Sequence, residues 1–234
     1  HTDRGLWGGI ILMGDAPISA GPQGTGSLPG LENPSRNLYG GPNPDDSSGE
    51  MAYVSIRHPG AGLTLNQPLS GLTLAGVGSG TLLHHIEIIA SGDGGVEILG
   101  GTAQLKYMVS AINSDNAFEF RQGWAGKGQF WFGFQRKKVG DIGGAFSGGN
   151  PGNPDFSARP IISNATFLGS GCEGNDPEDR TNTVGLQFRG KLGGIFTNNI
   201  ISGFKKALEV EDFEDEEDTE ISVDNVFIWD AERR

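Results

Sequence analysis

Four carboxylates recur at matched positions in two successive glycine-bounded segments. Asp93 and Glu97 lie in SGDGGVE, and Asp115 and Glu119 lie in SDNAFEF. On neighbouring strands of one sheet they would stack about 5 Å apart, where carboxylates raise one another's pKa or bind a cation. Such a row predicts a Ca²⁺ site or the acid and base of a polysaccharide-cleaving enzyme. The plainer interpretation is that the four acids cap turn amides. As the alternative to that interpretation, we assign the four as candidate metal ligands, and we assign no catalytic residue.

Three basic residues are expected close to this acidic row: Lys106, Arg121 and Lys127. A polysaccharide lyase needs a base beside the carboxylates, and these residues are the candidates for it. A hydrolase would instead use paired carboxylates. Both alternatives stay open at the level of the sequence.

An aromatic cluster follows the second pair of acids. Strict alternation along a strand places Phe130, Phe132 and Phe134 on one face, expected to be core, and Trp131 on the other. An exposed flat ring can stack on a sugar, or it can pack beneath a lateral loop. Trp124 and Trp131 are therefore the candidate ligand-binding residues for a glycan.

The histidines and the single cysteine offer little further chemistry. His84 and His85 are adjacent, so alternation directs them to opposite faces and predicts no metal pair. Cys172 is the only cysteine, which excludes an internal disulfide. His1 is expected to be a processed or trimmed terminus, without a second histidine nearby to complete a copper site.

The negative charge of the chain limits the classes of partner that it can bind. The net charge is −12, and an acidic run covers residues 209–220. The run is expected to be a solvated corner loop, with a divalent-cation site as the sharper alternative. A field of this sign repels phosphates, so no nucleic-acid partner is expected. No apolar stretch reaches the roughly 18 residues of a membrane span.

A repeat of strands and glycine-rich corners organises these residues. Glycine accounts for 40 of 234 residues, and the register recurs from Leu72 to Val96, from Val96 to Phe118 and from Leu186 to Leu208 in steps of 24, 22 and 22 residues. Repeats of this length built from strands indicate a solenoid. The fold class expected is all-β, a single right-handed parallel β-helix over residues 1–234 with six or seven coils.

Two kinds of position are predicted within the coils. Inward side chains should stack from coil to coil, as Leu72, Val96 and Phe118 in one column and Leu74, Ile98 and Phe120 in another. Lateral loops are expected at 20–50, 136–160 and 169–183 because they are rich in turn residues.

Four motifs in order carry a family resemblance. They are WGGIILMGDAPI at residues 7–18, YGGPNPDDSSG at 39–49, GLTLAGVGSGT at 71–81 and GWAGKGQF at 123–130. The chain resembles a family of secreted right-handed β-helix proteins found in Bacteroidetes and related bacteria. The resemblance implies a secreted or cell-surface location, a longer or processed parent chain and no established catalytic activity. The family's acidic doublets are reduced here to single acids.

These observations favour a structural or adhesive β-solenoid, secreted or at the cell surface, in preference to an enzyme. It would present loops for binding or assemble through its ends into fibres, because open solenoid ends expose strand edges. The rival is a polysaccharide lyase or hydrolase on a pectate-lyase-like β-helix. A third interpretation is a spacer stabilised by Ca²⁺, whose melting temperature would fall on chelation.

Overall fold

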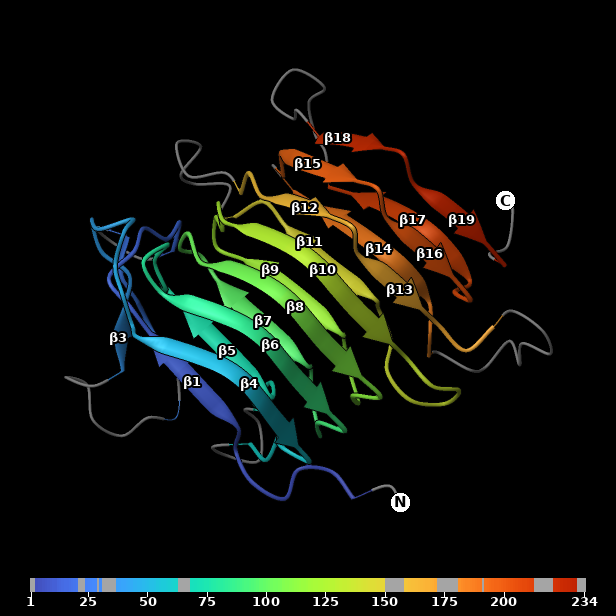
Figure 1. The fold of residues 1–234 in the computed structure, drawn as a ribbon, viewed down its shortest axis with the longest axis horizontal. Helices are drawn as coiled ribbons and strands as arrows, with labels where there is room; N and C mark the ends of the chain where they lie inside the picture. The colour runs from blue at the N-terminus through green and yellow to red at the C-terminus, as the bar shows by residue number, and fades with distance from the viewer. Residues whose placement is uncertain are drawn as a thin grey trace.

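The computed structural model describes residues 3–20, 24–28, 30, 37–62, 68–149, 158–171, 181–190, 192–212 and 221–230. Within these ranges the regular structure is β-strand, and all pairing apart from one two-stranded ribbon is parallel. The strands wind as a right-handed parallel β-helix, as the sequence predicts (Figure 1). No helix in the described part of the chain is long and apolar enough to cross a membrane.

Two parallel sheets form the walls of the solenoid. Sheet 1 has seven strands, one from each coil: β1 (Ile10–Met13), β5 (Leu72–Ala75), β7 (Val96–Leu99), β9 (Phe118–Arg121), β11 (Gly144–Ser147), β14 (Val184–Arg189) and β17 (Lys206–Glu211). Sheet 2 begins with four long strands: β4 (Glu50–Arg57), β6 (Leu82–Ile89), β8 (Gln104–Ala111) and β10 (Lys127–Phe134).

Sheet 2 continues with three pairs of short strands. They are β12 (Ile161–Ser163) with β13 (Thr166–Leu168), β15 (Gly194–Thr197) with β16 (Ile200–Ser202), and β18 (Ile221–Asp224) with β19 (Phe227–Trp229). The antiparallel ribbon of β2 (Gly26–Ser27) and β3 (Leu38–Tyr39) lies in the first lateral excursion.

The predicted inward columns are confirmed by the register of sheet 1. Leu72 pairs with Val96, and Val96 with Phe118. Leu74, Ile98 and Phe120 form the second column in the same way, and Phe146 and Phe188 extend it. Phe120 and Phe146 stack with ring centroids 4.4 Å apart, so the columns form a continuous aromatic and aliphatic core.

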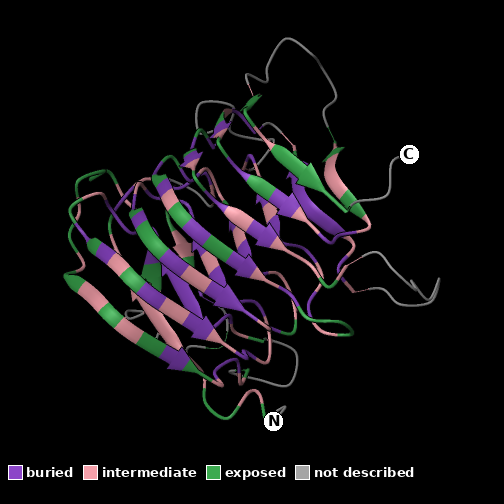
Figure 2. Ribbon diagram, turned by 45° about the vertical axis from the view of Figure 1, so that its right-hand side comes forward, coloured by how far each residue is buried: buried purple, intermediate pink, exposed green. Residues whose placement is uncertain are grey.

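A column of left-handed residues bends sheet 2. Tyr53, His85, Tyr107 and Phe130 lie in the middle of the four long strands with φ between 53° and 57°. The column continues at Asn164, Asn198 and Asn225, between the paired short strands. A left-handed residue interrupts strict alternation and turns the strand through a corner. The four long strands therefore carry an irregular banding of buried and exposed residues (Figure 2).

This column corrects the prediction for the phenylalanines. Phe130 and Phe132 are partly exposed, at 39% and 37%, whereas Trp131 is 2% exposed. The left-handed conformation at Phe130 resets the alternation, so the ring between the two phenylalanines is the one that enters the core.

A further coil lies where the sequence predicts a lateral excursion at 136–160. β11 occupies Gly144–Ser147 within that range, and β12 and β13 follow it. Gly144 stands in the column of Phe118 and Leu186 but contributes no side chain, and a Cβ there would lie 2.5 Å from the ring of Phe146. The apolar signature of the repeat is therefore missing from this coil, because Phe146 fills the space instead.

Candidate functional site

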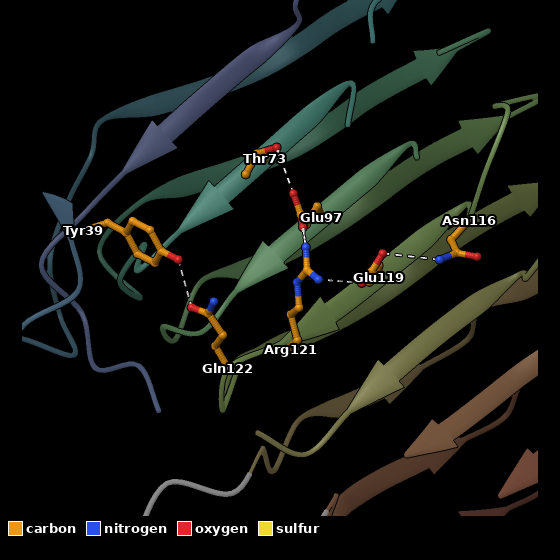
Figure 3. A network of polar contacts seen from close by, with 7 residues as sticks. All are labelled: Tyr39, Thr73, Glu97, Asn116, Glu119, Arg121 and Gln122. Atoms are coloured by element: carbon orange, nitrogen blue, oxygen red, sulfur yellow. Dashed lines mark hydrogen bonds and ion pairs between the residues drawn. The ribbon is translucent and has the colours of Figure 1, made fainter. Parts of the chain in front are cut away.

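The acidic row lies on the outer face of sheet 1. Thr73, Glu97 and Glu119 are consecutive partners on β5, β7 and β9, so their side chains form one column across the strands (Figure 3). Thr73 Oγ1 donates a hydrogen bond to Glu97 Oε2 at 3.4 Å. Neighbouring parallel strands are about 4.8 Å apart, which brings the two glutamates close together.

Arg121 neutralises part of this column. Its guanidinium donates a hydrogen bond to Glu97 and lies 3.7 Å from Glu119 Oε1. Burial works against the charged form, but Glu97 and Glu119 outweigh it and the pKa of Arg121 is raised. Arg121 therefore stays protonated, and it stands between the two glutamates where a bound cation would otherwise balance them.

A second acidic row lies at the turn that precedes each strand. Asp115 N–H donates to the backbone oxygen of Asp93 at 3.3 Å, which stacks the two turns. Burial, followed by the charges of Asp93, Glu119 and Asp141, raises the pKa of Asp115 to about 6. Asp115 thus holds a proton at mildly acidic pH, where an ordinary aspartate is ionised.

Glu119 connects the two rows. Burial raises its pKa, Arg121 opposes the shift, and Glu97 and Asp93 add to it. Asn116 Nδ2 donates to Glu119 Oε2 at 3.3 Å and fixes the side chain. Perturbed carboxyl groups gathered in a concave site are typical of functional sites.

The first lateral excursion closes one side of the site. Tyr39 on β3 is 4% exposed, and its hydroxyl donates to Gln122 Oε1 at 3.0 Å (Figure 3). Together with the acids, these residues enclose a cleft of about 610 Å³. The residues that line it are Ser27, Leu28, Tyr39, Pro68, Leu69, Ser70, Asp93, Glu97, Leu99, Asp115, Asn116, Glu119, Arg121 and Gln122.

The structure brings the four predicted acids to one cleft. Among the described residues, however, no three side chains of histidine, cysteine, aspartate or glutamate form a group that could hold a metal ion. The geometry thus gives no support to the predicted Ca²⁺ site, and the ion pairs of Arg121 explain how the glutamates are balanced without it.

Of the three predicted bases, only Arg121 lines the cleft. Lys106 and Lys127 lie on β8 and β10 of sheet 2, where they line a separate hollow with Gln104 and Gln129. The expectation that the lysines accompany the acids is wrong because the lysines follow the glycine corner that leads into the other sheet.

Trp124 and Trp131 are not exposed binding rings. Trp124 is fully buried, and its Nε1 donates to the backbone oxygen of Ala103 at 3.2 Å. Trp131 Nε1 donates in the same way to Leu105 at 3.0 Å, and its ring stacks on Phe118 at 4.6 Å. Each indole thus satisfies its donor on the preceding coil, and both rings belong to the core.

His84 and His85 also depart from the prediction. Because His85 is left-handed, both rings lie on the outer side of β6, and their Nδ1 atoms are 2.9 Å apart. The interpretation that alternation separates them is therefore wrong.

The other predicted sites lie mainly outside the described residues. This applies to His1, Cys172 and most of the acidic run at 209–220. At the beginning of the run, Glu209 accepts hydrogen bonds from Gln187 and Lys206, and Glu211 pairs with Arg189 at 2.9 Å.

Sequence reasoning missed Tyr39 and Gln122. Tyr39 opens the YGGPNPDDSSG motif, yet nothing in its spacing relates it to residues 83 positions away. Gln122 directly follows Arg121. Its polar side chain at the end of the strand is the one feature of the sequence that indicates a place in the site.

Comparison with known protein families shows the family to which this β-helix belongs. The family described as the pectate-lyase-like β-helix domain matches residues 1–232. The chain belongs to this family. No curated protein and no solved structure gave a match.

Proposed function

We propose that this protein is an extracellular β-helix protein that binds a polysaccharide in the cleft over sheet 1. The observation that carries the proposal is the cleft of about 610 Å³ in which Asp115, whose pKa is raised to about 6, lies with Asp93 and Glu119. Carboxyl, amide and guanidinium groups offer donors and acceptors to a hydroxyl-rich ligand. The lateral excursion that carries Tyr39 gives the cleft a wall, in keeping with a solenoid that presents loops for binding.

The charge of the lining selects among polysaccharides. Four carboxyl groups and a single guanidinium face the cleft, so its charge is negative at neutral pH. An acidic polysaccharide such as a polyuronate would be repelled, because like charges across an interface cost several kcal/mol. The ligand proposed is a neutral or an amino polysaccharide.

A hydrolytic activity at the same cleft is the second candidate. Glycoside hydrolases need one carboxylic acid that holds its proton and one ionised carboxylate. Asp115 fits the first role through its raised pKa. Glu97, paired with Arg121, fits the second. A lyase is disfavoured because Arg121 keeps its proton and the lysines lie on another sheet.

Affinity electrophoresis in gels that contain one polysaccharide at a time tests the binding proposal. The panel contains a neutral glucan, chitosan and polygalacturonate. We expect retardation by the glucan or by chitosan, none by polygalacturonate, and loss of retardation in Glu119→Gln. Glu87→Gln on sheet 2 removes an equal charge outside the cleft and should be retarded like the wild type.

Two outcomes decide between the candidates. Retardation without new reducing ends after prolonged incubation supports binding alone, whereas reducing ends that disappear in Asp115→Asn support hydrolysis. Equal retardation of the wild type and Glu119→Gln by every polysaccharide, each measured against a gel without polysaccharide, would contradict both.

End-to-end association is a further proposal for a solenoid of this kind. Among the described strands, β4 pairs only with β6, and β18 and β19 pair only with β15 and β16. The last coil exposes Phe227 at 59% and Trp229 at 68%. Unpaired edges with apolar side chains are templates for another strand.

Light scattering after gel filtration checks this association. We expect the wild type to elute as species larger than one chain, increasingly so at higher concentration. The double substitution Phe227→Glu and Trp229→Lys should reduce it to a monomer, since charges at an edge oppose pairing. A wild type that is monomeric at all concentrations would contradict the proposal.

A further inference from the structure

A pair of histidines outside the cleft has the geometry of a metal chelate. His84 and His85 lie on β6 of sheet 2, and both rings lie on its outer side. Their Nδ1 atoms are 2.9 Å apart and the ring planes are 88° to each other. In this contact one Nδ1 donates and the other accepts, so the two ring nitrogens face each other at a distance that one metal ion can bridge.

The separation of the two nitrogens indicates the kind of ion. Two nitrogen ligands about 2.0 Å from an ion and at right angles lie about 2.8 Å apart, whereas a tetrahedral angle separates them by about 3.3 Å. The observed 2.9 Å fits the tetragonal arrangement. Right-angled imidazole ligands are typical of Cu²⁺ and Ni²⁺, and Cu²⁺ binds more tightly.

Neighbouring rings hold the pair in place. The ring of His85 lies between Tyr53 and Tyr107, with centroid distances of 4.6 Å and 4.4 Å. Tyr53 also contacts the ring of His84 edge-on at 5.6 Å. Ligands whose orientation is fixed by packing lose less conformational entropy on binding.

Two basic side chains near the pair, Lys106 and Arg57, have interaction partners of their own. Lys106 is the partner of His84 on β8, but its ammonium group lies over the rings of Tyr107 and Phe130, at 5.2 Å and 5.6 Å. Arg57 is paired with Glu87 at 2.5 Å.

From this geometry we infer that His84 and His85 form a surface Cu²⁺ site, with both Nδ1 atoms as ligands and water in the remaining positions. When the metal binds, the ring that carries its proton on Nδ1 loses it to solvent and gains one on Nε2, so both rings stay neutral and both Nδ1 lone pairs can coordinate the ion. The site is independent of the polysaccharide cleft, because none of its residues lines that cleft.

Copper titration of the purified, chelator-treated protein tests the site. The background carries His1→Ala and Cys172→Ser, which removes the imidazole and the thiol that would compete for copper elsewhere in the sequence. We expect one tetragonal Cu²⁺ per chain, with nitrogen hyperfine coupling in the electron paramagnetic resonance spectrum. His84→Ala and His85→Asn should each weaken binding at least about tenfold, since each removes one of two ligands.

The matched control is His58→Asn. His58 and His85 are both left-handed, with φ of 54° and 53°, and asparagine tolerates this conformation, as Asn164 does in the same column as His85. His58→Asn should leave copper binding unchanged. If His85→Asn does not fold, as judged by circular dichroism, His84→Ala and His84→Gln carry the test. No binding in the background protein, or equal binding in His84→Ala, would overturn the inference.

Discussion

Replacing Trp131 with alanine is expected to lower the free energy of unfolding by about 3–5 kcal/mol, the largest effect anticipated for a single side chain. Trp131 is 2% exposed and stacks on Phe118, and its indole nitrogen satisfies the backbone oxygen of Leu105. The substitution removes the stacked ring, leaves a cavity and deprives a buried carbonyl of its partner. Urea denaturation followed by circular dichroism measures the change.

The neighbouring Phe132 supplies the control. It is 37% exposed on the same strand, so Phe132→Ala should cost far less, about 1 kcal/mol or below. Equal losses for the two variants would contradict the assignment of Trp131 to the core and restore it as a surface ring.

The second large effect is expected at Asp115, where asparagine should stabilise the protein at pH 8. The pKa of this carboxyl is raised from 3.8 to about 6 in the folded state. Below pH 3.8 the group is protonated in both states, so it has no effect on stability. Above pH 6 the folded state must hold an unfavourable charge, so stability is lost as the pH rises through this window.

The size of the effect follows from the shift. A shift of this size corresponds to at most about 3 kcal/mol, and solvent screening of the half-buried side chain reduces it to about 1–2 kcal/mol. Asp115→Asn should therefore exceed the wild type by about 1–2 kcal/mol at pH 8 and match it near pH 4. Denaturation at both pH values measures the difference.

Glu87 provides a control of opposite sign. Its pKa is lowered, chiefly by the hydrogen bond from Ser55 and further by Arg57, so Glu87→Gln should lose stability at pH 8 rather than gain it. If Asp115→Asn behaved like Glu87→Gln, Asp115 would be an ordinary ion-paired acid and its proposed role in the cleft would fail. A functional acid that costs stability is the expected trade-off in a binding site.

The repeat could be predicted because its signal is local. Leu72, Val96 and Phe118 mark the same inward position in successive coils, and parallel pairing follows from the spacing alone. The acidic row was predicted for the same reason, since Glu97 and Glu119 share one register. In a regular repeat, the position of a residue within its coil follows from its spacing to the residues around it in the sequence.

The remaining features depend on contacts that sequence spacing does not encode. A positive φ at Phe130 and at His85 leaves two consecutive side chains on the outer face, so the buried face changes within one strand and cannot be followed by alternation from its beginning. Tyr39 reaches the cleft from a lateral excursion whose path is set by tertiary packing. The coil that contains Gly144 lacks the apolar residue expected at that position, because the ring of Phe146 occupies the space that a side chain there would need.

The most direct test of the polysaccharide cleft is a crystal structure with an oligosaccharide from the glucan or the chitosan that retards the protein. We expect sugar density over β7 and β9, between Tyr39 and the row of Asp93 and Asp115, with Arg121 or Glu119 in hydrogen-bond contact. Density elsewhere on the solenoid, or an empty cleft at saturating oligosaccharide, would contradict it.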